Sequence, residues 1–450
     1  MSLKLRTVSA VLTIIASANL AGLSLVVAQS AAQVAANLPE PNAAASAMKF
    51  SKVIAWPEGK TPQAPEGLKV TAFVRDLDNP RWIYVLPNGD VLVAQSRTLP
   101  KPPKPEEAKA KPPEKKEEDK KKEEGMKKSK TVTGDSPNKI TLLRDADGNG
   151  EAEVNETFLE GLNQPFGMAL VGDRLFVANT DAIMSYPYKP GDTKIEDKGM
   201  KILDLPAGGY NNHWTRNLLA GRDGSKLYIS VGSASNNAEH GTAEEMLRAN
   251  ILECNLDGTA LRVFASGLRN PVGMDWNPAS GELWTAVNER DELGDELVPD
   301  YITSVKEGGF YGWPYAYFGQ HEDPRMNGQR PDLVKKTLIP DVATGAHTAS
   351  LGLAFYNLQS GPKALPEKYR GGAFIGQRGS WNRSEFAGYR VAFVPFEHGD
   401  PAGEPQDFLT GFIANENEVY GRPVGVAFTP DGALLVADEP SNIVWRVSAE

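Results

Sequence analysis

Hydrophobic and polar positions follow one sequence pattern, which occurs along the chain in six copies that differ in detail. Each copy has a small or polar lead-in, a short apolar run, a Gly-centred turn and a second apolar run. Two strands joined by a tight turn have this pattern, so each copy predicts a β-hairpin. The copies begin at Leu77, Leu162, His213, Leu268, Ser350 and Gly421.

Repeats of this kind are typical of propellers and other closed arrays. A blade buries its sheet faces only against neighbouring blades, and a ring satisfies that need for every blade. We therefore predict an all-β fold, a six-bladed β-propeller of four-stranded antiparallel blades over residues 67–448. The lead-ins of the hairpins should then meet near the central axis, where we expect the site.

Composition narrows the class of partner. The formal net charge is −10, which argues against a nucleic-acid partner because phosphate binding needs clustered, unpaired cations. Cys254 is the single cysteine, so no internal disulfide can form. It stands in a strand pattern, which predicts a buried and inert thiol.

The N-terminus has the features of a targeting segment. Lys4 and Arg6 precede the apolar run Val8 to Ala28, which ends in a cleavage pattern before Gln29. Residues 1–28 therefore predict a secretory signal peptide and a periplasmic or secreted protein with no membrane span after cleavage. A retained anchor is the alternative. Residues 29–66 form a leader and N-terminal extension, which we expect to lack structure up to about Asn42.

One charged segment does not belong to the repeat. Lys101 to Lys130 contains no aliphatic residue larger than Ala except Met126. Such a composition cannot bury enough surface to offset its ordering entropy. We predict a disordered insertion at about residues 99–132, within a loop of the first blade. A tether to an acidic partner or a membrane is the alternative.

Candidate chemistry gathers at the ends of the hairpins. His213 opens the third copy, and a histidine is the natural general base near neutral pH. Arg269, Arg378 and Arg422 also stand at hairpin ends and could converge on an anionic ligand. A structural histidine and surface ion pairs are the plain alternatives. The acidic loop 288–296 offers oxygen ligands for calcium, or is simply solvated.

A second oxygen-rich loop matches the calcium pattern D-x-D-x-N-G-x5-E. Its candidate ligands are Asp145, Asp147, Asn149 and Glu156. Lys139 to Arg144 has a strand pattern and Glu151 to Leu162 has no helical stripe, which excludes an EF-hand. The loop is therefore either a calcium-binding hairpin loop or an ordinary turn rich in Asp, Asn and Gly.

Longer motifs resemble a known family. They are HWTRNLL at His213, GLRNPVGM at Gly267, VNERDELGDELVPDYITSV at Val287, GGFYGWPY at Gly308, and GSWNRS with GYRVAFVPF after Gly379. Together they resemble the soluble, six-bladed glucose/sorbosone dehydrogenases that depend on pyrroloquinoline quinone (PQQ). The forms HWTRN and NERDELGDE are most similar to the L-sorbosone dehydrogenase branch.

The resemblance implies roles for individual residues. His213 would take the substrate hydroxyl proton, and Arg269 would stabilise negative charge at the reactive carbonyl. The sequence departs from the glucose branch at several positions, such as Trp214 after the histidine. The resemblance therefore implies the fold and the cofactor better than it implies the identity of the sugar. The implied cofactor contacts are Arg269, Asn270, Asn288, Arg378 and Arg422, with the backbone carbonyls of Glu289 and Arg290 for the cofactor's calcium.

The resemblance also implies the reaction. An aldose or sugar aldehyde would be oxidised by hydride transfer to PQQ, in the presence of calcium. No C-x-x-C-H haem motif occurs, so an external quinone or cytochrome would accept the electrons. Two other classes stay open: a calcium-dependent lactone hydrolase using Asp295, Glu296 and Asp438, and a non-catalytic propeller that binds glycans or partners.

Overall fold

Strands make up nearly all of the regular structure in the computed structural model, which describes residues 31–42, 47–100, 134–357 and 361–450. The predicted signal peptide and the insertion Lys101 to Lys130 lie outside these residues. Within them, no helix combines the length and the apolar character needed to cross a membrane.

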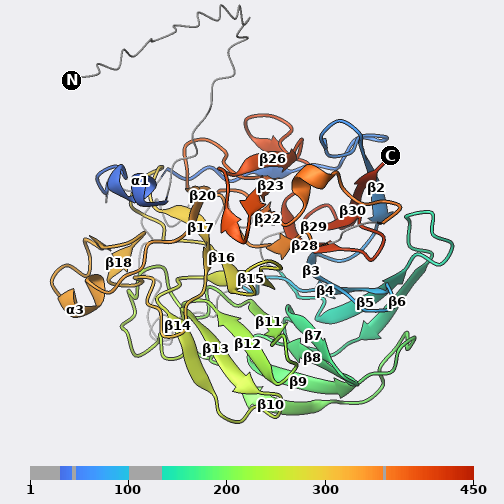
Figure 1. Ribbon diagram of the computed structural model, residues 1–450, viewed down its shortest axis with the longest axis horizontal. Helices are drawn as coiled ribbons and strands as arrows, with labels where there is room; N and C mark the ends of the chain where they lie inside the picture. The colour runs from blue at the N-terminus through green and yellow to red at the C-terminus, as the bar shows by residue number, and fades with distance from the viewer. Residues whose placement is uncertain (1–30, 43–46, 101–133, 358–360) are drawn as a thin grey trace, which may run out of the picture.

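Six four-stranded antiparallel sheets surround one axis (Figure 1), which confirms the predicted propeller. Each predicted hairpin forms the two inner strands of one blade. From the axis outward, the blades are β3 (Pro80–Val85), β4 (Val91–Gln95), β5 (Lys139–Arg144), β6 (Val154–Leu159); β7 (Met168–Val171), β8 (Arg174–Ala178), β9 (Ala182–Pro187), β10 (Met200–Asp204); β11 (Arg216–Ala220), β12 (Lys226–Val231), β13 (Asn250–Asn255), β14 (Arg262–Ser266); β15 (Pro271–Trp276), β16 (Leu283–Val287), β17 (Pro299–Ser304), β20 (Val342–Ala346); β21 (Ala354–Phe355), β22 (Ala373–Gln377), β23 (Arg390–Val394), β26 (Gln406–Leu409); and β28 (Pro423–Phe428), β29 (Leu434–Asp438), β30 (Ile443–Ala449), β2 (Leu68–Val74).

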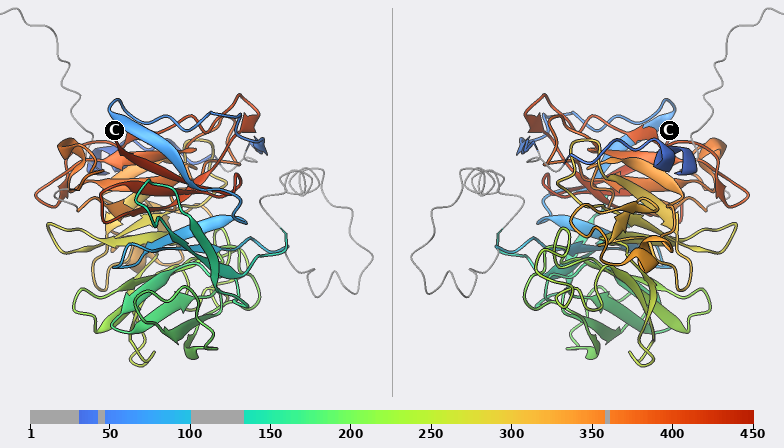
Figure 2. Two further views of the ribbon diagram at one scale, coloured as in Figure 1. Left: turned by 90° about the vertical axis from the view of Figure 1, so that its right-hand side faces the viewer. Right: turned by 90° about the vertical axis from the view of Figure 1, so that its left-hand side faces the viewer.

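The ring is closed by strands from the two ends of the chain. β2 is the outermost strand of the sixth blade and pairs with β30, with Val70 opposite Val447. Figure 2 shows these two strands side by side near the C-terminus. The sixth blade is therefore incomplete until both ends of the propeller are in place.

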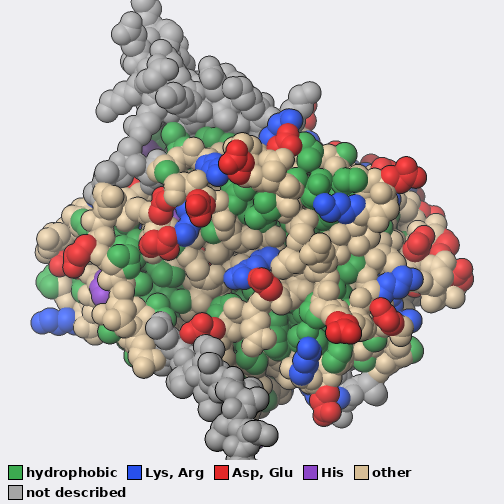
Figure 3. Space-filling view, turned by 90° about the horizontal axis from the view of Figure 1, so that it is seen from above, with side chains coloured by type: hydrophobic (Ala, Val, Ile, Leu, Met, Phe, Trp, Pro, Cys, Tyr) green, Lys and Arg blue, Asp and Glu red, His purple; other side chains and the backbone are tan. Residues whose placement is uncertain are grey.

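The hydrophobic core is divided among the blade interfaces. Phe158 and Val177 belong to the cluster between the first and second blades, and Phe374 and Trp445 to the one between the fifth and sixth. Comparable clusters fill the other four interfaces. Cys254 is fully buried in one of them, as predicted, and burial raises the pKa of its thiol to about 11. On the side shown in Figure 3, acidic and basic side chains are interspersed.

Neighbouring innermost strands approach closely at the axis. A Cβ atom on Gly273 of β15 would lie 2.5 Å from the backbone nitrogen of Leu353, and one on Gly425 of β28 would lie 2.6 Å from the carbonyl oxygen of Arg81. Both glycines occupy the same position in their copies of the repeated pattern, within the sequences VGM and VGV. Glycine is required there because the neighbour is backbone and cannot move aside.

The N-terminal extension differs from expectation. The prediction that the chain up to about Asn42 lacks structure is wrong for its last residues, which include α1 (Ala31–Ala36). Ala35 packs against the apolar cluster of the fourth blade, and the Asn42 amide donates to the Leu293 carbonyl at 2.9 Å. The Ala-rich sequence favours a helix, and packing of the helix against this apolar cluster stabilises it.

We expect Gly273→Ala to lower the free energy of unfolding by about 1–3 kcal/mol or more, because the new methyl group meets the backbone of the neighbouring blade. Gly208→Ala is the matched control, since no atom lies within 4 Å of its Cβ position. Urea unfolding followed by tryptophan fluorescence measures both. Equal stabilities for the two variants would contradict close packing at the axis.

Candidate active site

The lead-in and the exit of each hairpin meet at one end of the propeller axis. Pairing of β15 with β16 brings Asn270 beside Asn288, whose amide donates to the Asn270 carbonyl at 3.1 Å. In the sixth blade the Glu439 amide donates to the Arg422 carbonyl at 3.2 Å in the same way. Residues from several blades therefore converge, and we call this convergence the axial site.

His213 is held as an unprotonated base. Its Nδ1 lies 2.8 Å from the Ser233 carbonyl oxygen and 2.9 Å from the Ser233 hydroxyl. A ring that donates from Nδ1 to this carbonyl keeps the lone pair on Nε2. Burial, and then the charge of Arg269, lower the pKa of His213 from 6.5 to about 3. The imidazole is therefore neutral across the physiological range and can accept a proton.

His213 and Asn270 lie side by side because Gly232 separates them. A Cβ atom on Gly232 would be 2.5 Å from the His213 Cβ and 2.3 Å from the Asn270 Oδ1. Asn270 is 5% exposed, and its Oδ1 has no hydrogen-bond partner among the described residues. A buried acceptor without a donor is costly, so this atom marks a place for a ligand donor.

Arg269 organises the loop that follows β16. Its guanidinium donates to the carbonyls of Asn236, Asn288 and Glu289, and to the side chains of Asn236 and Asp291. The shortest of these bonds, to the Glu289 carbonyl, is 2.6 Å. All five N–H groups of an arginine are thereby used. Arg269 can therefore act on a ligand through its charge, but it has no free donor in this arrangement.

The loop 288–291 is anchored by buried carboxylates. The Asn288 side chain and the Glu289 amide both donate to Asp300, at 3.1 and 2.8 Å. The Arg290 guanidinium donates a hydrogen bond from Nη1 to the Asp323 carboxylate at 2.5 Å. Burial raises the pKa of the Glu289 carboxyl to about 7. The backbone of this loop is thus fixed, which suits the predicted use of its carbonyl groups.

Asp291 brings a negative charge close to the base. Its carboxylate accepts hydrogen bonds from Arg269 and Asn382 and lies 3.6 Å from Nδ1 of His347. Burial opposes ionisation of Asp291, but the charge of Arg269 and the contact with His347 lower its pKa well below the ordinary range. Burial likewise opposes protonation of His347, and Asp291 outweighs it, so the pKa of His347 is raised.

Two arginines bind one carboxylate elsewhere at the axial site, and a third lies near them. Arg81 donates to Glu439 Oε1 at 2.7 Å, and Arg378 donates to the other oxygen. Arg422 is the third arginine; it makes no ion pair with Glu439 among the described contacts, but its charge acts on that carboxylate. Burial opposes the ionisation of Glu439, but Arg378 and Arg81 lower its pKa to about 2. Three positive charges against one negative charge make this arginine cluster an attractive place for an anion.

The two parts of the axial site are linked through Trp214. The guanidinium of Arg81 lies 5.3 Å from the centre of the Trp214 ring, next to His213 in the chain. The expected convergence of three arginines is therefore found only in part. Arg378 and Arg422 come together, whereas Arg269 makes its described contacts with the loops around Asn236 and Asn288.

Sequence reasoning missed Arg81 and Glu439, and it included Asp291 only as a member of the acidic loop 288–296. It weighed hairpin lead-ins more than hairpin exits, although Glu439 follows β29 directly, as Asn288 follows β16. Arg81 lies one residue inside its strand, where the alternation pattern predicts no chemistry. The repeat itself carried the missing signal, because equivalent exits of different copies reach the same end of the axis.

The predicted calcium loop connects β5 and β6, as expected for a hairpin. Carboxylate oxygens of Asp145, Asp147 and Glu153 lie within 4.8 Å of one another. Among the described residues, these three side chains form the one group of this kind that could hold a metal ion. Asn149 donates to Glu153 at 3.1 Å. Glu156 lies within β6, opposite Leu142, and outside this group.

The carboxylates considered for lactone hydrolysis have separate partners. Asp295 accepts from the amide of Ser384 at 3.0 Å, and Glu296 pairs with Arg383. Asp438 is buried and accepts from the Arg422 amide at 2.7 Å. These three do not form a metal-binding group in the described part of the chain.

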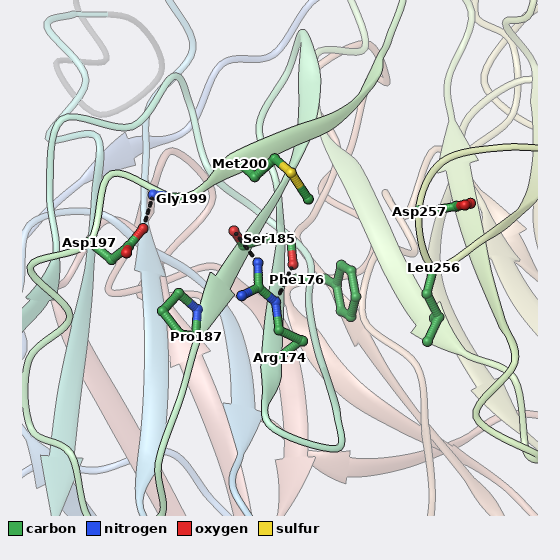
Figure 4. Close-up of a pocket in the computed structure, with 9 residues that line it drawn as sticks. All are labelled: Arg174, Phe176, Ser185, Pro187, Asp197, Gly199, Met200, Leu256 and Asp257. Atoms are coloured by element: carbon green, nitrogen blue, oxygen red, sulfur yellow. Dashed lines mark hydrogen bonds between the residues drawn. The ribbon is translucent and has the colours of Figure 1, made fainter.

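A hollow of about 530 Å³ lies away from the axial site, on the outer part of the second blade. Figure 4 shows Met200 and Phe176 along it, with Arg174 bonded to Ser185 beside them and Leu256 on the neighbouring hairpin. None of the residues predicted from sequence lines this hollow.

Fold and site together define a six-bladed propeller with a polar, positively charged site on its axis. A family model described as a domain of unknown function (DUF7133) matches residues 67–445, and the chain belongs to this family.

Three curated relatives match over shorter stretches. An uncharacterized protein of Borreliella burgdorferi is 29% identical over 307 residues, 65% of this chain and 78% of that protein. The aldose sugar dehydrogenase YliI of Escherichia coli is 32% identical over 196 residues, 42% of this chain and 45% of that enzyme. A pyrroloquinoline quinone-dependent sugar dehydrogenase of Hypocrea jecorina is 25% identical, over 35% of this chain and 42% of that enzyme. The chain therefore matches less than half the length of these two enzymes.

Solved structures share the architecture. The holo form of the PQQ domain of pyranose dehydrogenase from Coprinopsis cinerea has a TM-score of 0.66 at 20% identity, covering 88% of this chain and 98% of that domain. A calcium structure of the Trichoderma reesei enzyme of family AA12 has a TM-score of 0.66 at 17% identity, covering 90% and 100%. At these identities the likeness shows the fold.

The depressed pKa of His213 predicts a pH dependence of stability. Between about pH 6.5 and pH 3 the unfolded chain binds a proton at this residue and the folded protein does not, so stability falls as the pH is lowered through this window. His213→Gln should therefore lose less stability on acidification than the wild type. Melting temperatures from pH 7.5 to 4 measure this, with the exposed His398→Gln as control. Parallel curves for all three proteins would contradict a neutral, buried His213.

Proposed function

We propose that the protein is a quinoprotein oxidoreductase that oxidises an aldose or a sugar aldehyde, with PQQ as hydride acceptor and with calcium. The observation that carries the proposal is a neutral His213 at the same end of the axis as three arginines whose positive charge Glu439 balances only in part. The names of the curated relatives and the fold shared with PQQ-containing and calcium-containing structures support it.

The residues fit such a cofactor. PQQ carries several carboxylates, which guanidinium groups bind well. The arginine cluster has an excess of positive charge, and the buried Nε atoms of Arg81 and Arg422 have no partner among the described residues. Asn270 adds an unpaired acceptor. Arg378 and Arg422 would hold carboxylates of the cofactor, while Asn270 and Asn288 would contact its ring system.

Calcium would be bound by the loop that Arg269 holds. A carbonyl oxygen has two lone pairs, so the Glu289 carbonyl can accept from Arg269 and still offer one pair to an ion. The carbonyl of Arg290 would be the second ligand. Calcium accepts such hard oxygen donors in flexible geometry. The fixed backbone of the loop would place both carbonyls without further ordering.

PQQ, when bound, supplies a carbonyl carbon that accepts the hydride from the sugar. The protein supplies the base: His213 takes the proton of the sugar hydroxyl at Nε2, while its Nδ1–H stays on Ser233. The charge of Arg269 favours negative charge developing nearby. Asp291 lies close enough to stabilise the imidazolium once it forms. An aldose would give a lactone, and a sugar aldehyde, which would react as its hydrate, would give an acid.

The finer assignment is a sorbosone-like substrate. It rests on the motif from Val287 to Val305 and on Trp214. The Trp214 indole donates a hydrogen bond to Thr98, which fixes the ring next to His213 and leaves less space there for a substrate. An external quinone or cytochrome would reoxidise the cofactor. The N-terminal pattern places this reaction in the periplasm or outside the cell.

We expect His213→Gln to lower the turnover number about a hundred- to ten-thousand-fold, because a positioned base contributes rate of that order. Cofactor binding, followed by quinone absorbance, should largely survive. Arg269→Ala should impair both, since the loop for calcium loses three hydrogen bonds and Asn236 loses two. Reconstituted protein is assayed with a panel of sugars and a dye acceptor, and His398→Gln is the control. Wild-type turnover by His213→Gln would overturn the proposed mechanism.

We also propose a structural calcium ion at Asp145, Asp147 and Glu153, because three close carboxylates repel one another without a cation. Calcium should raise the melting temperature of the quinone-free wild type by a few degrees, and Asp147→Ala should abolish this gain. Glu156→Ala is the matched control because Glu156 lies outside the group. An unchanged gain in Asp147→Ala would mean that the loop is an ordinary turn.

A further inference from the structure

A segment that precedes the propeller reaches the arginine cluster. We call residues 47–56 the N-terminal strap. The Lys49 amide donates to the Trp381 carbonyl at 2.9 Å, and the Phe50 ring stacks on Trp381 at 5.8 Å. β1 (Lys52–Val53) then pairs in parallel with β27 (Glu418–Val419), just before the lead-in of the sixth blade.

The strap continues to the end of β29. The Trp56 indole donates to Asp438 at 3.1 Å and packs edge-on against Trp445 at 5.2 Å. Asp438 is the last residue of β29 and directly precedes Glu439. The strap therefore follows the rim of the axial site from the fifth blade to the sixth, with backbone and side-chain contacts at both ends.

Ser51 is the strap residue that faces Arg422. Its hydroxyl accepts a hydrogen bond from Arg422 Nη2 and lies 3.2 Å from the hydroxyl oxygen of Tyr389, which itself donates to the Ser380 carbonyl at 2.6 Å. Ser51 and Arg422 are each 2% exposed. Because Ser51 is buried and fixed by neighbours on the strap, it can fix the guanidinium in turn.

Arg422 has few other constraints. Its guanidinium lies 5.5 Å from the centre of the Tyr389 ring, and its Nε has no partner. Within the described ranges no carboxylate lies at ion-pair distance from it, whereas Arg81 and Arg378 both pair with Glu439. A buried guanidinium without a counter-ion points to an anionic ligand, and Ser51 holds it in place for that ligand.

We propose that Ser51 is a positioning residue of the cofactor site: through Arg422, the N-terminal strap prepares the arginine cluster to bind an aromatic polycarboxylate. The proposal rests on the proposed function, which identifies that polycarboxylate as PQQ. It extends the site beyond the propeller repeats, to a segment in which the hairpin pattern predicts no function.

The test compares Ser51→Ala, Ser51→Thr and Lys52→Ala with the wild type. Lys52 is the matched control because it neighbours Ser51 but points outward, with 70% of its side chain exposed, to Glu418. Two ligands are titrated into quinone-free protein at a temperature where circular dichroism shows every variant folded: PQQ, followed by absorbance, and benzene-1,3,5-tricarboxylate, followed by calorimetry.

We expect Ser51→Ala to raise the Kd of both ligands about ten-fold or more, since a hydrogen bond to a charged group is lost. Ser51→Thr, which keeps the hydroxyl, and Lys52→Ala should stay within about two-fold. At saturating PQQ, the turnover number and the sugar KM of Ser51→Ala should remain near wild type, because the base is untouched.

Wild-type affinity of Ser51→Ala for both ligands would overturn the proposal, as would a failure of Ser51→Thr to restore binding. If the wild type binds the tricarboxylate but not PQQ, the proposed function fails, and the tricarboxylate titrations alone decide the role of Ser51. If the wild type binds neither ligand, the arginine cluster is not a carboxylate site and the proposal is wrong.

Discussion

The approach of neighbouring innermost strands at the axis is the constraint on which the rest of the structure depends. Six strands can surround a narrow axis only if their backbones nearly touch, and the glycines in VGM and VGV make that possible at Gly273 and Gly425. The Gly167 amide donates to the Arg216 carbonyl at 2.9 Å, so the second and third blades are joined there by a hydrogen bond as well. The close spacing brings residues of different blades within reach of one small molecule.

The same geometry concentrates charge. Because every lead-in and exit opens at one end of the axis, Arg81, Arg378 and Arg422 arrive at a common place from three different blades. Buried cations repel one another, and one carboxylate, Glu439, balances only part of their charge. Such an arrangement lowers stability unless a ligand completes it. The ligand-free site therefore carries positive charge that Glu439 does not balance, at a cost in stability.

Much of the fold could be predicted from sequence because the hairpin is a local structure. Alternating apolar positions and Gly-centred turns specify two strands at a time, and six copies specify the ring. The outer strands are less regular, and β2 is found next to β30 only when the ring closes. The sequence places three site residues near the axis because they begin copies of the repeated pattern: His213, Arg269 and Asn270.

The rest of the site depends on contacts between distant segments. Ser51 lies outside the repeats and directly before β1, so only the pairing of β1 with β27 in the folded chain shows that it meets Arg422. Glu153 instead of Glu156 faces Asp145 because β6 begins at Val154, which turns the final glutamate of the pattern into a strand residue. Spacing along a sequence predicts ligands only where the backbone between them has the conformation that the pattern assumes.

The two parts of the axial site impose opposite requirements on one ligand. Near His213, the positive charge of Arg269 and the burial of the ring keep the imidazole unprotonated, so that region favours a neutral hydroxyl group that can lose a proton. Around Glu439, uncompensated guanidinium groups favour carboxylates. A sugar alone meets the first requirement and a polycarboxylate alone meets the second. The proposed function meets both requirements, since it places a neutral substrate at the base and an anionic cofactor at the arginines, the arrangement that hydride transfer between them needs.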